Sequence, residues 1–219
     1  MTRPEAFIFD LNGTLIDDME YHNAAWYAIL NHDLKAGLTK EQVKQQMYGK
    51  NEELLERVFG KGRFDKQEID EISMRKERAY QQAFRPRLQL IAGASDFLER
   101  ARLARIRMGI GTAAIPYNVD FVLDNLGIRD YFGSIVSADD VEKSKPDPET
   151  CLRAAHGLDA VAAACVVFED APKGVEAARR AGMSCIVLTT MHGKDEFGQF
   201  PNVLGYIADY TDPSLGELF

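Results

Sequence analysis

Short apolar runs recur along the chain, and helix-forming stretches separate them. The candidate strands are Ala6–Phe9, Arg107–Gly111, Ser134–Val136, Cys165–Phe168, Cys185–Leu188 and Tyr206–Ala208. Most of these runs are apolar on both faces, which is typical of a parallel sheet covered on both sides by helices. The helices expected between them are Ala94–Ala104, Asn118–Leu126, Pro148–His156 and Pro172–Ala181. The pattern predicts an α/β fold built on a parallel sheet.

Two of these helices have clear start signals. Asp147 precedes Pro148, which predicts an N-cap followed by proline at the first helical position. Pro172 opens the other helix, and Gly182 follows its end.

One segment, from about residue 16 to residue 88, interrupts the alternation with helices alone. Its first helix has an apolar stripe made of Met19, Trp26, Leu30 and Leu34. Further helix starts are indicated by Thr39 with Gln42, by Asn51 and by Asp65 with Glu68. We predict a core domain formed by residues 1–15 and 89–219, with a small all-helical cap domain, 16–88, inserted after the first strand.

Composition excludes several classes of partner. The net charge of −8 and the pI of about 5.1 disfavour a nucleic-acid partner. No apolar run approaches the ~18–20 residues that span a membrane, and no secretory signal pattern opens the sequence. Cys151, Cys165 and Cys185 have no metal-ligand spacing, so we expect reduced, buried thiols. These features predict a cytoplasmic protein, expected to be a monomer.

Chemical groups follow the predicted strands in order. Asp10 ends the first strand, and a glycine turn with a hydroxyl follows at Gly13 and Thr14. Such a strand end can present a nucleophilic aspartate. Ligands bind outside the carboxyl ends of strands in open α/β sheets, so the other strand ends should complete the site.

The second strand leads into Thr112 and Ala113, whose hydroxyl and backbone N–H groups suit phosphate oxygens. After the third strand, Lys145 can neutralise a phosphate. The fourth ends in Glu169 and Asp170, carboxylates suited to a hard cation such as Mg²⁺. Each group alone has an ordinary structural explanation, but four consecutive strand ends with these groups indicate a phosphoryl-transfer site.

These motifs resemble the haloacid dehalogenase superfamily, in the subgroup of β-phosphoglucomutase and phosphoglycolate phosphatase. The resemblance covers essentially the whole length, including the inserted helical cap. It implies a Rossmann-like core, Mg²⁺ dependence and an aspartyl-phosphate intermediate. By the same resemblance, Asp10 is the nucleophile and a metal ligand, and Thr112 and Lys145 hold the transferring phosphoryl group. Asp170 then binds the metal, and Glu169 binds it or orients its shell.

Asn12 departs from the pattern that the resemblance implies. Similar enzymes have a second aspartate here, which protonates the leaving oxygen and later activates the attacking group. Only its backbone carbonyl contacts the metal, so Asn12 should preserve metal binding while removing the acid–base group. Loss of a positioned acid or base costs about 10²–10⁴ in rate.

Three interpretations of Asn12 compete: a natural phosphatase that is slow or uses another acid, an engineered Asp→Asn variant, and a pseudo-enzyme that only binds a phosphorylated ligand. We favour the first, because the remaining motifs are whole. His22 is then a candidate substitute acid, against the alternative of a histidine on a helix surface.

The cap sequence bears on the substrate. Related mutases carry a cap arginine that grips a second phosphate, and the corresponding position here holds Glu52. Lys50 is the nearest residue that could compensate, and Lys76 could face the site unless it is a solvated lysine on a charged helix. We therefore predict a Mg²⁺-dependent phosphatase for a small phosphorylated metabolite. A sugar phosphomutase and a binding-only pseudo-enzyme are the alternatives.

Overall fold

The computed structural model describes residues 3–219, which divide into two compact units. One unit contains the chain up to Asp17 and again from Gln89 to Phe219, and the other is Asp18–Leu88. The sequence predicted these junctions at 15/16 and 88/89. Each unit is described below by itself.

The first unit is built on a six-stranded sheet in which every pair of neighbouring strands is parallel. Its strands are β1 (Ala6–Phe9), β2 (Arg107–Gly111), β3 (Ser134–Val136), β4 (Cys165–Glu169), β5 (Ser184–Leu188) and β6 (Val203–Ile207). Their order in the sheet is β3-β2-β1-β4-β5-β6. The predicted α/β fold with a parallel sheet is confirmed. The last strand was predicted too late: it begins at Val203 and ends before Ala208.

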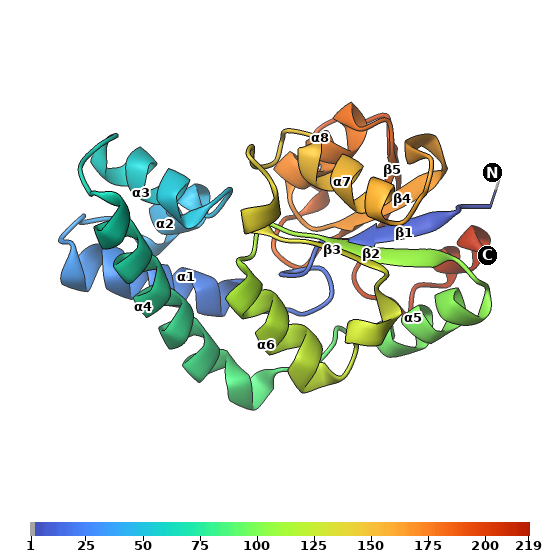
Figure 1. Ribbon diagram of the computed structural model, residues 1–219, viewed down its shortest axis with the longest axis horizontal. Helices are drawn as coiled ribbons and strands as arrows, with labels where there is room; N and C mark the ends of the chain where they lie inside the picture. Colours follow the sequence, from blue (N-terminus) through green and yellow to red (C-terminus); the bar gives the residue numbers. More distant parts are fainter. Residues whose placement is uncertain (1–2) are drawn as a thin grey trace. The chain divides into compact units, whose positions relative to one another are not determined.

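Helices cover both faces of this sheet (Figure 1). They are α5 (Ala94–Leu103), α6 (Pro116–Leu126), α7 (Glu149–Gly157) and α8 (Pro172–Arg180). Helices α7 and α8 pack together on one face, and α5 and α6 lie on the other (Figure 1). The covering of both faces explains why the strands are apolar throughout.

Alternation along β1 and β4 separates two cores. Ala6 and Ile8 belong to the apolar core on the α7–α8 face. Phe7 and Phe9 point to the opposite face, where they join an aromatic cluster. The other members of this cluster are Phe97, Phe132, Phe168, Tyr210 and Phe219. The two-residue period of a strand produces this division, and it also sets the direction of the side chains that follow each strand.

The second unit is helical throughout. Its elements are α1 (Met19–Tyr27), a π-helix (Ala28–Asp33), α2 (Lys40–Gln46), α3 (Asn51–Phe59) and α4 (Lys66–Phe84). Trp26 and Leu30, from the predicted apolar stripe, are buried in its core together with Leu54, Leu55 and Ile72. Within the described residues of this unit there is no strand, as predicted.

Predicted helix starts are partly confirmed. Thr39 with Gln42 and Asp65 with Glu68 form capping boxes. The predicted Asn51 cap is wrong, because α3 already includes Asn51 and its N-cap is Lys50. The side-chain amide of Asn51 donates instead to Glu77 of α4, at 2.8 Å. Similarly, α7 begins at Glu149 with Pro148 at the N-cap, although the Asp147 carboxylate accepts from the Glu149 N–H.

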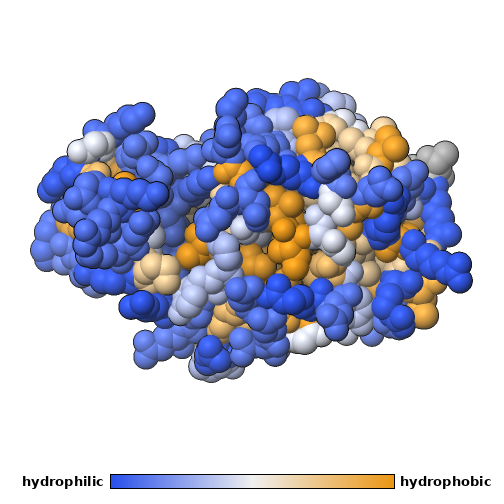
Figure 2. Space-filling model, viewed as in Figure 1, coloured by the Kyte–Doolittle hydropathy of each residue, from blue (hydrophilic) through white to orange (hydrophobic). Residues whose placement is uncertain are grey.

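The three cysteines are free and buried, as expected. Burial raises the pKa of the Cys151 thiol to about 12 and that of Cys165 to about 11, so both stay protonated. The visible face of the molecule is mainly hydrophilic, with separate apolar areas (Figure 2). Among residues 3–219, no helix combines the length and the apolar character needed to cross a bilayer.

Candidate active site

The site lies where the strand order reverses. After β1 the chain adds β2 and β3 on one side, and β4 then begins the other side. Asp10 follows β1, and its N–H continues the ladder to Phe168 O at 3.0 Å. Glu169 is the last residue of β4, and Asp170 follows it. Crevices at such a reversal are where open α/β sheets bind ligands.

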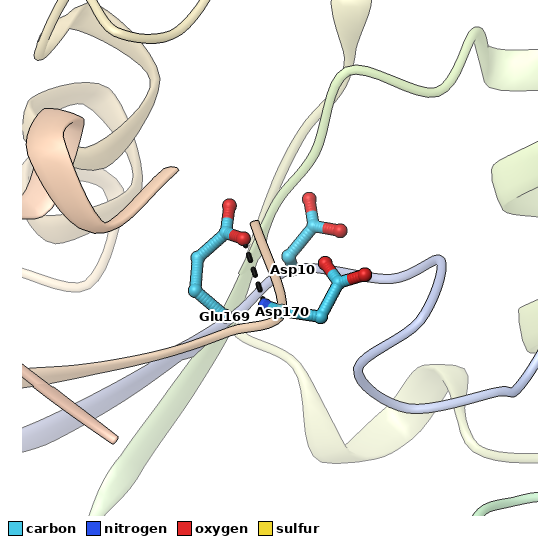
Figure 3. A group of neighbouring side chains, drawn as sticks. All are labelled: Asp10, Glu169 and Asp170. Atoms are coloured by element: carbon cyan, nitrogen blue, oxygen red, sulfur yellow. Dashed lines mark hydrogen bonds between the residues drawn. The ribbon is translucent and has the colours of Figure 1, made fainter. Parts of the chain in front are cut away.

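Three carboxylates gather at these two strand ends (Figure 3). Asp10, Glu169 and Asp170 each offer an oxygen, and these oxygens all lie within 4.8 Å of one another. All three residues are buried. Because buried like charges repel unless a cation compensates them, the cluster fits a hard divalent cation with oxygen ligands such as Mg²⁺.

Lys145 joins the same cluster from the loop that precedes α7. Its Nζ donates to Asp10 Oδ1 at 2.8 Å and to Glu169 Oε1 at 2.6 Å. Only 9% of its side chain is exposed, so the solvated alternative is excluded. The alternation of side chains along a strand explains why Lys145 meets these two carboxylates. Asp10 and Glu169 lie two residues after Ile8 and Val167 and so point to the same face of the sheet, which carries α7.

The charge states follow from burial and from the neighbouring charges. Burial raises the pKa of Asp10 to about 6; Lys145 opposes this rise and Glu169 adds to it. Burial by itself would lower the pKa of Lys145, but attraction by Asp10 and Glu169 outweighs it and raises that pKa. Lys145 therefore stays a cation, and the carboxylate of Asp10 is left destabilised in a way that a bound divalent cation would relieve.

Glu169 is locked in place by the protein. Its Oε2 accepts from the N–H groups of Asp170 and Ala171, at 2.9 and 3.0 Å, while Oε1 faces Lys145. A carboxylate with both oxygens engaged in this way is better placed to orient its neighbours than to change partners. Of the two roles expected for Glu169, binding the metal or orienting the groups around it, this geometry favours the second.

Gly174 leaves the space that Glu169 occupies. A Cβ on this glycine, in the first turn of α8, would lie 1.7 Å from Glu169 Oε1. This contact was not predicted from the sequence. The sequence signal for it was a glycine five residues after Glu169, where the first turn of the following helix passes close to the end of the strand.

Replacement of Gly174 by alanine is expected to reduce both stability and activity. Alanine favours a helix over glycine by about 1 kcal/mol, but a clash with a locked, buried carboxylate should cost about 1–3 kcal/mol and displace Glu169. Urea unfolding and phosphate release would measure the two effects. Gly216→Ala is the control, because a Cβ there meets nothing within 4 Å; equal behaviour of the two variants would contradict the prediction.

The residues predicted to hold phosphate lie at the neighbouring strand end. Thr112 is 1% exposed, and its N–H bonds to Val136 O at 3.0 Å. A hydrogen bond from Thr112 also contributes to lowering the pKa of Asp10, against the larger effect of burial. The Thr112 hydroxyl accepts from Ala114 N at 3.1 Å, and Ala113 between them is half-buried. Asn12 is also half-buried, two residues beyond Asp10.

His22 and Lys76 lie together inside the helical unit. Lys76 Nζ is 2.6 Å from His22 Nδ1, and it also donates to the two Glu77 carboxylate oxygens at 3.0 and 3.1 Å. An ammonium can only donate, so His22 Nδ1 accepts and Nε2 carries the hydrogen. His22 Nε2 in turn is 3.3 Å from Asp18 Oδ2, which also accepts from Tyr80.

Both side chains in this pair are buried, with Lys76 3% and His22 8% exposed. Burial lowers the pKa of Lys76, although Glu77 opposes this. The alternatives of a solvated lysine and a surface histidine are therefore excluded. His22 already contacts charged groups through both nitrogens, so an acid role would require it to exchange one of these partners.

Lys50 and Arg57 are the basic residues at the N-cap and in the last turn of α3. Lys50 is half-buried at the N-cap, where its N–H donates to Glu53, and Glu52 is exposed. Arg57 donates to the backbone oxygens of Gln46 and Tyr48, each at 2.6 Å. Arg57 therefore fastens the loop that precedes α3.

A buried acidic cluster with an attached lysine, at the strand-order reversal of a parallel sheet, defines a class of phosphoryl-transfer sites. The haloacid dehalogenase-like hydrolase family model matches residues 7–188. The chain belongs to this family, in its β-phosphoglucomutase and phosphatase-like subgroup.

Characterised relatives cover most of the chain. It is 30% identical to fructose-1-phosphate phosphatase of Escherichia coli over 84% of its length and 96% of the relative. It is 31% identical to β-phosphoglucomutase of Bacillus subtilis, over 83% of its length and 82% of the relative. A solved hydrolase of the same superfamily from Entamoeba histolytica superimposes with a TM-score of 0.86, at 25% identity, over 98% of this chain and 97% of the other.

Proposed function

We propose that the protein is a Mg²⁺-dependent phosphatase of a small phosphorylated metabolite, acting through an aspartyl phosphate on Asp10. The observation that carries the proposal is the buried cluster of Asp10, Lys145, Glu169 and Asp170 at the reversal point of the sheet. Relatives named as phosphatases of phosphorylated sugars and metabolites support the reaction class.

In the proposed reaction, a carboxylate oxygen of Asp10 attacks the phosphorus, and the bond from phosphorus to the leaving oxygen breaks. Water then cleaves the acyl phosphate, which releases inorganic phosphate and restores the carboxylate. Lys145 offsets the repulsion between Asp10 and the incoming anion, and the Thr112 hydroxyl and the Ala113 N–H bind phosphoryl oxygens.

The residues proposed to hold Mg²⁺ are Asp10, Asp170 and the backbone carbonyl of Asn12, with Glu169 orienting the group. Bound Mg²⁺ would supply positive charge that stabilises the transferring phosphoryl group. The fit rests on the chemistry of the donors, since hard oxygen ligands in a buried anionic cluster are what this cation prefers.

The helical unit is proposed to be the cap that selects the substrate, through Lys50, Lys76 and His22. The His22–Lys76 pair is the candidate proton source in place of the acid–base carboxyl that Asn12 lacks. The monomeric state and the cytoplasmic location stay predictions from the sequence.

Phosphomutase activity is the second candidate, because β-phosphoglucomutase is among the relatives. Two features of this chain count against it. Asn12 cannot provide the acid–base help that both half-reactions of a mutase need, and Glu52 stands at the cap position where related mutases carry an arginine. A binding-only protein is the third candidate.

Phosphate release from p-nitrophenyl phosphate, sugar phosphates and pyrophosphate, with and without Mg²⁺, tests the proposal. We expect Mg²⁺-dependent release that stops when EDTA is added. Ligand-induced thermal stabilisation without turnover would favour the binding-only protein. Conversion of β-glucose 1-phosphate to glucose 6-phosphate would establish the mutase instead.

A further inference from the structure

Two adjacent threonines follow β5 at the edge of the sheet that carries the site. Thr190 Oγ1 donates to Gly13 O at 2.6 Å, across 177 positions of sequence. Thr189 Oγ1 donates to Ile207 O at 3.2 Å, beside the end of β6. The two hydroxyls therefore make similar bonds in opposite directions: Thr190 toward the turn after Asp10, and Thr189 away from it.

The position of Gly13 determines where the Asp170 carboxylate can lie. Gly13 has φ +70°, and a Cβ at this residue would be 2.1 Å from Asp170 Oδ2. The backbone of Gly13 thus packs directly against one of the three clustered carboxylates. A shift of this turn by a few tenths of an ångström would change the space available to Asp170.

The turn is fastened at several points. At its start, Asp10 N bonds to Phe168 O at 3.0 Å, and within it Leu11 O accepts from Leu15 N at 2.9 Å. Neither bond restrains the Gly13 carbonyl, which Thr190 binds from another strand end. Thr190 therefore connects the end of β5 to the turn between Asp10 and Thr14, at the residue that touches Asp170.

We propose that Thr190 is a positioning residue for the metal site, which holds the Asn12–Gly13 segment and through it the Asp170 carboxylate. This inference rests on the proposed Mg²⁺ dependence. It assigns no contact between Thr190 and the cation. Its effect passes through the backbone of Gly13, as hydrogen bonds behind metal ligands commonly act.

Isothermal titration with Mg²⁺ alone, without substrate, tests this role. Thr190→Val keeps the shape of the side chain and removes the hydroxyl. Loss of one hydrogen bond predicts Mg²⁺ binding weaker by about 3- to 10-fold. Thr190→Ser restores a hydroxyl and should bind within about twofold of the unaltered protein. Thr189→Val is the matched control and should retain the unaltered affinity.

Thermal unfolding without Mg²⁺ separates positioning from general loosening, because Thr190→Val and Thr189→Val should then melt alike. Unaltered Mg²⁺ affinity in Thr190→Val, an equal loss in Thr189→Val, or weak binding in Thr190→Ser would each overturn the proposal. If the unaltered protein binds Mg²⁺ but releases no phosphate, the phosphatase function fails while the titrations still decide the role of Thr190. If it binds no Mg²⁺, both fail.

Discussion

Replacement of Asp10 by asparagine is expected to abolish phosphate release, with a loss of about 10⁴-fold or more, the scale on which removal of a covalent nucleophile acts. An amide oxygen is a weak nucleophile and would not form the acyl phosphate. The change also removes the anion that Lys145 Nζ contacts at 2.8 Å. Turnover of several substrates, and mass spectrometry of the acid-quenched protein for a phosphoryl adduct, would measure the effect.

The stability of the same variant distinguishes lost chemistry from lost folding. Burial and Glu169 already raise the pKa of Asp10 to about 6, so its charged form is destabilised when no cation is bound. Without Mg²⁺ the variant should melt at or above the temperature of the unaltered protein, and stabilisation by added Mg²⁺ should shrink. Asp96→Asn, at an exposed position on α5, is the control and should change neither property. Full activity in Asp10→Asn would contradict the proposed mechanism.

The sheet and its site edge were predictable because the information is local. In an apolar run such as Phe7–Phe9, alternate side chains enter the cores on the two faces of the sheet, and polar residues follow the run immediately. In a parallel sheet the carboxyl ends of neighbouring strands share one edge. Knowing that Asp10 and Glu169 follow strands was therefore enough to expect them near each other.

What the sequence did not predict depends on contacts between distant residues. Buried Lys76 contacts His22, which is 54 positions away in the sequence, and Glu77. In the sequence alone, Lys76 and Glu77 look like part of a solvated helix face. The space that Gly174 leaves and the bond from Thr190 to Gly13 are also tertiary. The shift of the α3 cap to Lys50 accompanies a competing bond from Asn51 to Glu77. None of these features has a periodic signature.

Restoring an acid at position 12 should have the opposite effect to removing the nucleophile. Asn12→Asp is expected to raise the rate on sugar phosphates by about 10²–10⁴, the usual contribution of a positioned general acid. The new carboxyl can protonate the leaving oxygen and then draw a proton from the attacking water. Steady-state phosphate release from sugar phosphates, with Mg²⁺ present, measures the gain.

The size of this gain should depend on the leaving group. A sugar alkoxide is a strong base and needs a proton as it leaves, whereas p-nitrophenolate and phosphate are weaker bases and need it less. Asn12→Asp should therefore accelerate sugar-phosphate hydrolysis much more than hydrolysis of p-nitrophenyl phosphate or pyrophosphate. Asn12→Ala is the matched control: it removes the amide without adding an acid, so it should leave the slow rate on sugar phosphates nearly unchanged.

An unchanged rate in Asn12→Asp would mean that another group already transfers the proton. The candidate is the His22–Lys76 pair, in which Lys76 Nζ lies 2.6 Å from His22 Nδ1. In that case His22→Asn should slow the unaltered protein far more than it slows the Asn12→Asp variant, because the new carboxyl would take over the transfer. Equal slowing of both would instead assign His22 to the stability of the helical unit, where it stacks on Tyr80 at 3.7 Å between ring centroids. The two substitutions together thus distinguish an enzyme that is slow because Asn12 is not an acid from one in which His22 serves as the general acid.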